Sequence, residues 1–370
     1  MSVGLTTERR ELARSVRGFV SRQVPMTSVR RLMGDPSGYD PELWRKMADQ
    51  LALPGIAIPE IYGGAGCGYA ELAVVFEELG RSLVPSPFLG TVALAVPALL
   101  ASDDEAALEA YAMQLADGSR TATLAWVEED GNWTGGRETQ ARQASAGWRL
   151  DGQKSYVLDA VTADLLFVTA SSPNGLSLYA VESDAPGVTR IALHAFDQTR
   201  ALGRIVLSDA PARLVGEVGA GEKILSAALD RAATLLAAEM VGGAEACLDM
   251  SVEYAKVREQ FGRPIGSFQA IKHKCAEVLV ELEGARAATY YSAWAADNNP
   301  DELPATTCIA KANASEAFFR AAAENVQIHG GIGATWEHDA HLFLKRAKAS
   351  YILLGDPSYH RLRLADRIGL

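Results

Sequence analysis

The strongest constraint on the fold is a change of hydrophobic period along the chain. Residues 121–218 hold short runs rich in Val, Ile, Leu and aromatic residues, such as "DLLFVTA" and "LSLYAVES", separated by turn residues such as Asp151-Gly152. Such runs predict β-strands. On both sides of this region apolar residues recur at spacings of three and four, which predicts helices. The sequence therefore predicts a small antiparallel β domain, a barrel or a sandwich, between two helical regions.

These patterns predict an α+β fold with three domains. We expect an N-terminal helical domain over 1–120, the β domain over 121–218, and a C-terminal helical domain over 219–370. A chain of 370 residues is too long for one small core. The last domain contains a long Ala-rich helix, further helical segments and a short tail; those segments are 268–297, 303–330 and 335–349. Long amphipathic helices of this kind commonly pair with other subunits.

Composition excludes several classes of partner. The net charge of −11 argues against general nucleic-acid binding and against docking on anionic membranes. The apolar stretch "TVALAVPALLA" is too short to span a bilayer and holds a Pro, and the charged N-terminus does not resemble a signal peptide. Four scattered cysteines are typical of reduced, mostly buried thiols in a cytoplasmic protein, and the six histidines show no metal-site spacing. We expect no metal, no nucleic acid and no membrane partner.

Two stretches combine a helix boundary with groups suited to a phosphate. In "VREQFGRPIGSFQ", residues 257–269, Gly and Pro interrupt a helical region, so a turn or a ligand must explain the break. In "QIHGGIGATWEH" the glycines allow backbone to approach a ligand and precede a helix expected near Trp336. This second motif does not follow a strand, so it is not a Rossmann fingerprint. A helix C-cap followed by a turn would also account for each stretch.

Together, the two stretches resemble the acyl-CoA dehydrogenase family. "LWRKMADQLALPGIAIPEIYGGAGCGYAELAVVFEELGRSL" is similar to its N-terminal helical domain and "GWRLDGQKSYVLDAVTADLLFVTA" to its central β domain. The resemblance implies a C-terminal four-helix bundle, FAD as cofactor, an acyl-CoA substrate and an electron-transfer flavoprotein as acceptor. It also implies a homo- or hetero-tetramer in which the turn at 262–266 reaches FAD held by a neighbouring subunit.

The resemblance also assigns cofactor-binding residues. Arg258 is expected to contact the FAD pyrophosphate, because its planar fork suits a phosphate. The remaining contacts fall into three sets: the adenine and ribose region is lined by Gln260, Phe261, Ile265 and Phe268; the dimer partner contributes Gln327, Gly330 and Gly331; and the flavin ring packs on Val127 and Tyr156.

The catalytic base does not carry over. The family reaction needs a buried carboxylate that removes the proton from Cα, and it places this Glu at one of two positions. Those positions hold Leu354 and Ala232 in this sequence. Asp356 and Glu239 are weak candidates for a relocated base. The position before Pro357 favours a turn or helix-start role for Asp356, and Glu239 could pair with a neighbouring Arg.

Two loops at the flavin also depart from the family pattern. The Thr-Glu-Pro…Gly-Ser-Asp loop is replaced by "WVEEDGNWTGG", and Leu158 stands where the family has a Thr hydroxyl. The substituted loops resemble actinobacterial two-gene α2β2 enzymes that act on steroid side-chain CoA thioesters. Three interpretations remain: a non-catalytic subunit of a heteromeric dehydrogenase, a homo-oligomeric dehydrogenase with a relocated base, or a binding or structural protein without flavin.

Overall fold

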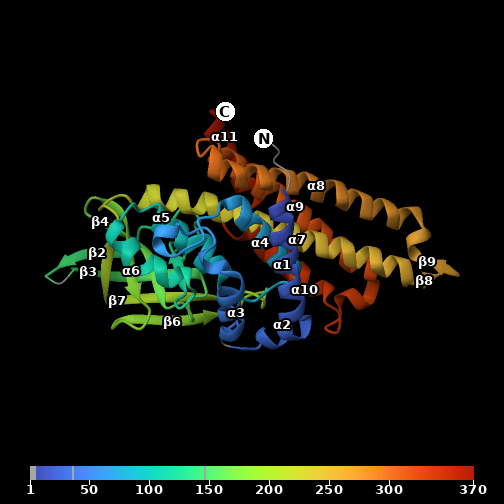
Figure 1. Ribbon diagram of the computed structural model, residues 1–370, viewed down its shortest axis with the longest axis horizontal. Coiled ribbons are helices and arrows are strands. Elements are labelled where there is room, and N and C mark those ends of the chain that lie inside the picture. Colours follow the sequence, from blue (N-terminus) through green and yellow to red (C-terminus); the bar gives the residue numbers. More distant parts are fainter. Residues whose placement is uncertain (1–5, 36, 146) are drawn as a thin grey trace. The chain divides into compact units, whose positions relative to one another are not determined.

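The computed structural model describes residues 6–35, 37–145 and 147–370. The chain forms two compact units. The first contains the described residues up to Arg30 together with Tyr69–Val84 and Ala233–Leu370. The second contains Arg31–Gly68 and Pro85–Ala232. Figure 1 labels the elements, whose order of helices, then strands, then helices confirms the predicted fold class. The limits of the three predicted domains stay a proposal.

The N-terminal region is helical as expected. Its α-helices are α1 (Thr7–Gln23), α2 (Met26–Leu32), α3 (Pro41–Leu51), α4 (Tyr69–Arg81), α5 (Val96–Leu100) and α6 (Glu105–Ala116), with short 3₁₀ turns at Leu53–Gly55 and Glu60–Tyr62. Side chains of Thr6, Asp40 and Asp104 cap three of these helices by accepting backbone N–H groups of the first turn. The apolar stretch predicted to be too short for a membrane span forms a buried π-helix, η3 (Leu89–Ala95), that continues into α5.

The central sheet has seven strands in the order β1-β4-β2-β3-β7-β5, with β6 paired to β7. They are β1 (Ala122–Ala125), β2 (Gln140–Ala144), β3 (Gly147–Leu158), β4 (Leu165–Ser172), β5 (Gly175–Glu182), β6 (Val188–Leu193) and β7 (Leu202–Val215). The predicted antiparallel pairing holds for most strand pairs of this sheet, but β4 pairs in parallel with β1 and, at one residue pair, with β2. Between β1 and β4 the chain passes through β2 and β3, and this connection allows β4 to run in the same direction as β1.

Strand β2 was not predicted. Its sequence "QARQA" lacks β-branched and aromatic residues, and only Ala141 is buried. The pairing comes from the partner strand, since Gln140 to Ala144 align with Asp151 to Gly147 of β3. Tertiary pairing here overrides a weak local preference.

The C-terminal region consists of α7 (Gly221–Val257), α8 (Gln269–Asn298), α9 (Leu303–His329), α10 (Ala340–Ile352) and α11 (Pro357–Ile368). Helix α9 packs against α8, α10 and α11. The expected helical segments match α8 and α9, but the last one begins at Ala340 and not at 335. The expected short tail is helix α11, which Asp356 caps. Among the described residues, no helix combines the length and apolarity needed to cross a bilayer.

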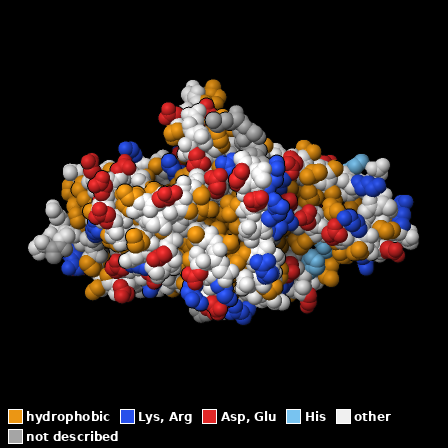
Figure 2. Space-filling model, viewed as in Figure 1, with side chains coloured by type: hydrophobic (Ala, Val, Ile, Leu, Met, Phe, Trp, Pro, Cys, Tyr) orange, Lys and Arg blue, Asp and Glu red, His pale blue; other side chains and the backbone are white. Residues whose placement is uncertain are grey.

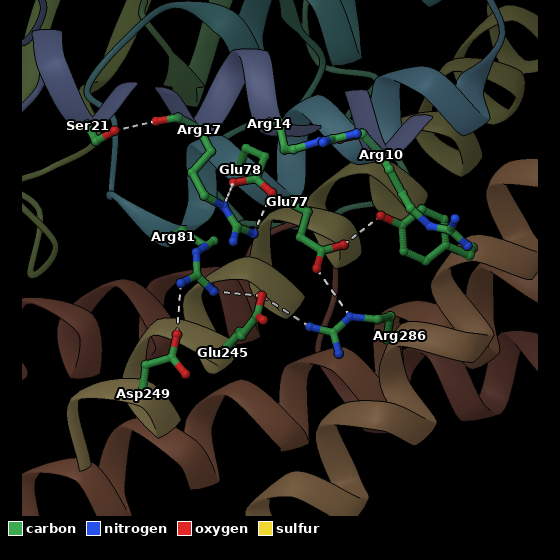
Figure 3. A network of polar contacts seen from close by, with 11 residues as sticks. Arg10, Arg14, Arg17, Ser21, Glu77, Glu78, Arg81, Glu245, Asp249 and Arg286 are labelled. Carbon is green, nitrogen blue, oxygen red and sulfur yellow. Dashed lines mark hydrogen bonds and ion pairs between the residues drawn. The ribbon is translucent and has the colours of Figure 1, made fainter. Parts of the chain in front are cut away.

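A network of charged side chains connects four helices of the first unit (Figure 3). Arg17 of α1 makes two 2.8 Å hydrogen bonds with Glu78 of α4. Next to it, Glu77 accepts hydrogen bonds from Arg286 and from the hydroxyl of Tyr290 on α8, at 3.2 and 2.7 Å. Glu77 and Glu78 are buried, so the arginines compensate carboxylates that lie away from water.

Two glycines let helices α4 and α7 touch backbone to backbone. A Cβ on Gly80 would lie 2.0 Å from the carbonyl oxygen of Glu239, and one on Gly242 would lie 1.8 Å from that of Glu77. Cβ atoms cannot approach carbonyl oxygens this closely, so no larger residue fits at either position without moving a helix. The pair fixes how α4 and α7 cross.

The surface carries mixed charge. Figure 2 shows Lys and Arg side chains interspersed with Asp and Glu on the viewed face. Two of the four cysteines, Cys247 and Cys308, are buried, whereas Cys67 is exposed and Cys275 is partly exposed. The expectation of mostly buried thiols therefore holds for only half of them.

Candidate functional site

The break at residues 257–269 is a two-residue β-hairpin. Strands β8 (Glu259–Gln260) and β9 (Arg263–Pro264) pair antiparallel, and the turn consists of Phe261 and Gly262, with φ of 54° and 75°. Positive φ at both central residues is the geometry of a type I′ turn, whose twist matches that of the flanking strands. The Phe261 side chain is 91% exposed. The hairpin thus presents an aromatic ring to solvent between two long helices.

The other predicted residues of this stretch surround the hairpin. Arg258 directly follows α7, and its backbone carbonyl accepts the N–H of Ile265 at 2.8 Å across the hairpin. The ring of Phe268 lies edge-on to Phe261, with centroids 6.1 Å apart, and Arg263 stacks over it at 4.2 Å. The structure therefore brings Arg258, Gln260, Phe261, Ile265 and Phe268 into one cluster, in which Ile265 and Phe268 are partly buried and the other three residues are exposed.

The glycine stretch lies at the end of α9. Gly330 has φ of 66° and ends the helix, with its N–H bonded to the carbonyl of Gln327, and a 3₁₀ turn, η5 (Gly330–Ala334), follows. Nothing lies within 4 Å of a Cβ built on Gly330 or on Gly331, and Gln327 is exposed. The backbone here is open to a ligand. The helix expected near Trp336 begins at Ala340, because the chain first makes further turns held by Arg30, which donates to His338 and Asp339.

The three histidines near this stretch do not form a metal site. His329 stacks on Tyr254 with centroids 4.2 Å apart and lies 4.3 Å from His338, while His341 stacks on Trp336 at 5.2 Å. Across the described residues no group of three or more His, Cys, Asp or Glu could hold a metal ion. Burial lowers the pKa of His338 and of His341. They belong to an aromatic cluster between α7, α9 and α10.

The two residues expected at the flavin ring lie in the second unit. Val127 is 1% exposed, and its backbone carbonyl accepts the N–H of Ser155 at 2.8 Å. Tyr156 is 44% exposed and has φ of 56°, at a point where the pairing of β3 with β7 shifts register. The Tyr156 ring is therefore available to a ligand, whereas the Val127 side chain is buried and its backbone carbonyl anchors Ser155, the neighbour of Tyr156.

The two positions at which the family resemblance predicts a base, Ala232 and Leu354, are buried and apolar. Ala232 lies within α7 and is 0% exposed. Leu354 is 5% exposed and adopts φ of 62°, a conformation that is uncommon for a branched side chain. The turn that carries Leu354 is thus held in a strained conformation although it presents no carboxylate.

The two candidates for a relocated base have other partners. Asp356 accepts the N–H of Tyr359 at 2.8 Å and caps α11, as its position before Pro357 suggested. Glu239 accepts a 2.8 Å hydrogen bond from Arg346 of α10, and both side chains are buried. These contacts match the structural alternative considered for each residue.

Sequence reasoning missed two buried bases that hold the Leu354 turn. Lys311 is fully buried on α9 and donates to the carbonyls of Ser350 and Gly355 at 3.1 and 2.9 Å; burial lowers its pKa to about 7. His360 lies 3.0 Å from the Leu354 carbonyl through Nε2, and burial lowers its pKa to about 3. A Lys among small apolar neighbours in "CIAKANA" was the available signal.

The exposed groups fit FAD by their chemistry. Arg258 supplies a bidentate donor for phosphate, and the open backbone at Gly330 and Gly331 lets a bulky anion approach closely. In the second unit, the buried hydroxyl of Ser155 has no hydrogen-bond partner and stands next to the exposed Tyr156. Each unit therefore carries groups suited to a dinucleotide.

Two protein-family models match the chain. Residues 6–119 match the acyl-CoA dehydrogenase N-terminal domain, and residues 219–369 match the acyl-CoA dehydrogenase C-terminal domain. Acyl-CoA dehydrogenase IpdE2 from Mycobacterium tuberculosis is 39% identical over 361 residues, which cover 98% of this chain and 97% of the relative.

Solved structures are also similar to this chain over nearly its whole length. The ChsE4-ChsE5 complex from Mycobacterium tuberculosis is similar with a TM-score of 0.91 and 29% identity, covering 100% of this chain and 99% of that chain. A variant of the Tcur3481-Tcur3483 steroid ACAD is similar with a TM-score of 0.88 and 32% identity, covering 98% of both chains.

Proposed function

This chain belongs to the acyl-CoA dehydrogenase family, and from that premise we propose that it is one subunit of a heteromeric, FAD-dependent acyl-CoA dehydrogenase that desaturates an acyl-CoA thioester. One observation carries the proposal. Both positions for the base hold buried apolar residues, Ala232 and Leu354, while most of the groups expected to contact FAD, Arg258 and Tyr156 among them, are exposed. A second dehydrogenase subunit then supplies the carboxylate.

The residues of this chain have binding roles in the proposal. Arg258 holds the pyrophosphate of FAD, and the backbone at Gly330 and Gly331 lies close to the cofactor. Tyr156 packs on the flavin ring, and Phe261 covers the adenine region. FAD, when bound, supplies the acceptor for the hydride that leaves Cβ of the thioester, and an electron-transfer flavoprotein then takes up the electrons.

The comparisons support the partner and the substrate class. ChsE4-ChsE5 is a complex of two differently named proteins, and Tcur3481-Tcur3483 is a steroid ACAD. We infer a hetero-tetramer with a second acyl-CoA dehydrogenase subunit, and a CoA thioester with a bulky steroid-derived acyl group as substrate.

The first test is the flavin absorbance of the chain purified alone at known protein concentration. We expect a colourless or substoichiometric protein that gains flavin and activity when it is mixed with a second dehydrogenase subunit. A stoichiometric yellow protein that bleaches with an acyl-CoA would refute the obligate-partner proposal and favour a homo-oligomer with a relocated base. Failure to gain flavin with any subunit would favour a flavin-free binding protein.

A second test restores a carboxylate. Leu354→Glu places a Glu where the family carries its base, and the matched control Leu353→Glu buries the same charge one residue earlier in the same turn. We expect Leu354→Glu, loaded with excess FAD in the absence of a second subunit, to bleach when an acyl-CoA is added, whereas neither the native chain nor Leu353→Glu bleaches under the same conditions. If both variants fold and bind FAD but neither bleaches, the Leu354 position does not face a substrate.

A further inference from the structure

A buried ion pair in the second unit is not explained by a contribution to folding stability alone. Lys154 of β3 is 0% exposed, and its Nζ lies 2.8 Å from Oε1 of Glu128, which follows β1 and is 3% exposed. Replacing a buried ion pair by apolar residues is often neutral or stabilising, so such a pair is weak support for a purely stabilising role. The segments that the Lys154–Glu128 pair holds in place indicate its role.

Glu128 joins three segments of the sheet. Its two carboxylate oxygens accept the backbone N–H groups of Glu138 and Thr139, each at 2.9 Å, just before β2. A Cβ on Gly136 would lie 2.1 Å from this carboxylate, so only glycine allows the loop to close over it. Burial disfavours the charge, but the bonds from Lys154 and from these N–H groups outweigh burial and lower the pKa of Glu128 to about 2. The carboxylate therefore stays ionised in the sheet.

Lys154 stands directly before an irregularity in β3. The pairing of β3 with β7 shifts register between Lys154 and Val157, and Tyr156 within this bulge has φ of 56°. A positive φ is costly for a residue with a large side chain and persists only where the surroundings impose it. On one side the ion pair holds Lys154, and next to it Ser155 donates its N–H to the carbonyl of Val127 at 2.8 Å.

The same contacts fix the loop that borders the Tyr156 ring. A Cβ on Gly131 would lie 3.8 Å from the Tyr156 ring, so the loop passes beside the ring. Trp126 holds this loop, because its Nε1 donates to the carbonyl of Trp133 at 3.1 Å. Its own carbonyl accepts the N–H of Gly136 at 3.1 Å. The loop, the bulge and the ring are thus connected through one buried ion pair.

We propose that Lys154 and Glu128 are positioning residues for Tyr156: their ion pair sets the strand bulge that presents the Tyr156 ring to the flavin. The inference rests on the proposed function for the identity of the ligand, and on the structure alone for the geometry. On this proposal, the ion pair affects the affinity of the chain for flavin more than it affects the free energy of unfolding.

The test compares Lys154→Met with Leu150→Ala. Leu150 lies on the same strand and is fully buried in the apolar core of the sheet, and its aliphatic side chain makes no hydrogen bond or ion pair with Lys154 or Glu128, so its truncation destabilises the sheet without removing a partner of the ion pair; Leu150→Val is the milder substitute if the Ala variant does not fold. In FAD titrations of the chain with its partner subunit, we expect Lys154→Met to weaken binding at least tenfold and Leu150→Ala to stay within about threefold. Equal losses in the two variants would overturn the proposal.

A double-mutant cycle isolates the link to the ring. Tyr156→Ala alone should weaken FAD binding, and adding Lys154→Met to it should cause little further loss, because the pair acts through the ring. Independent, multiplying losses would show that the ion pair does not act through Tyr156.

Hydrogen exchange of the flavin-free chain separates this proposal from the proposed function. We expect Lys154→Met to lower amide protection at Glu138, Thr139 and Ser155, and Leu150→Ala to leave these three amides relatively protected. If the exchange pattern changes as expected but no FAD binds to any form, the positioning role stands and the proposed function fails. Unchanged protection at these amides in Lys154→Met would overturn the positioning role whatever the flavin result.

Discussion

Asp159, directly after β3, is predicted to make the stability of the chain fall as pH rises. Its side chain is 6% exposed, and Gly90 of η3 lies so close that a Cβ on it would be 2.5 Å from Oδ2. Burial raises the pKa of Asp159 from 3.8 to about 7, although the Arg200 charge and the Gly90 N–H act in the opposite direction. The folded state therefore binds this proton more tightly than the unfolded state does.

The sign and size of the effect follow from linkage. Because the folded pKa is raised, the stabilising contribution is fully present below pH 3.8 and is lost as pH rises through about 7. Each pKa unit corresponds to about 1.4 kcal/mol, so ionised Asp159 costs the folded state about 4 kcal/mol at pH 8, to order of magnitude. Asp159→Asn cannot ionise and keeps an oxygen acceptor for the Gly90 N–H. Its stability relative to the native sequence should rise by up to this amount between pH 4 and 8.

Urea unfolding followed by tryptophan fluorescence at pH 5, 6, 7 and 8 measures the difference. Asp184→Asn is the matched control, since Asp184 is an exposed Asp of the same unit and its substitution removes a carboxylate without altering a buried site. A flat difference for Asp159→Asn, or one that falls as pH rises, would refute the reasoning. A falling difference would mean that Arg200 outweighs burial and that the carboxylate is ionised in the folded state.

Three further predictions concern charged groups of the first unit. Glu239→Ala leaves the buried Arg346 without the Glu239 carboxylate and should lower the free energy of unfolding by about 3–5 kcal/mol. A loss of flavin reduction at unchanged stability would instead support Glu239 as a base. Asp356→Ala should cost about 1 kcal/mol by removing the cap of α11, whereas Asp356→Asn should be nearly neutral, as thermal unfolding of both variants can establish. Arg286→Met leaves Glu77 buried without its cation and should cost about 3–5 kcal/mol in urea unfolding; a loss below 1 kcal/mol would show that Tyr290 alone compensates Glu77.

The sequence predicted the parts of the fold that depend on local pattern. Helices α7, α8 and α9 follow from periodicity, and most strands of the sheet follow from β-branched runs between turns. Strand β2 could not be predicted, because "QARQA" becomes a strand only through its pairing with β3. Helix α11 was expected only as a short tail, with a helix start at Asp356 as one alternative, since its polar sequence has few apolar positions to show the period.

The sequence predicted some residues of the candidate site and not others, because only some of them are marked by a local pattern. Exposed residues such as Arg258 and Phe261 could be found from Gly and Pro punctuation and from the family resemblance. Lys154 and Glu128 could not, because 26 positions separate them and only the folded sheet brings them together. For Lys311 the sequence offers only its small apolar neighbours as a signal, because the carbonyls that it binds come from Ser350 and Gly355, far along the chain.

The glycine contacts between α4 and α7 set a limit on how this chain can vary. A core leucine can be exchanged for other apolar residues of similar volume, since neighbouring side chains repack. Gly80 and Gly242 have no such freedom, because a side chain there would meet main-chain oxygens and not other side chains. In a saturation mutagenesis experiment scored by folding, these two small residues should tolerate fewer substitutions than the large residues around them. The positions that contribute least apolar surface would then be the slowest to diverge among relatives that retain this helix crossing.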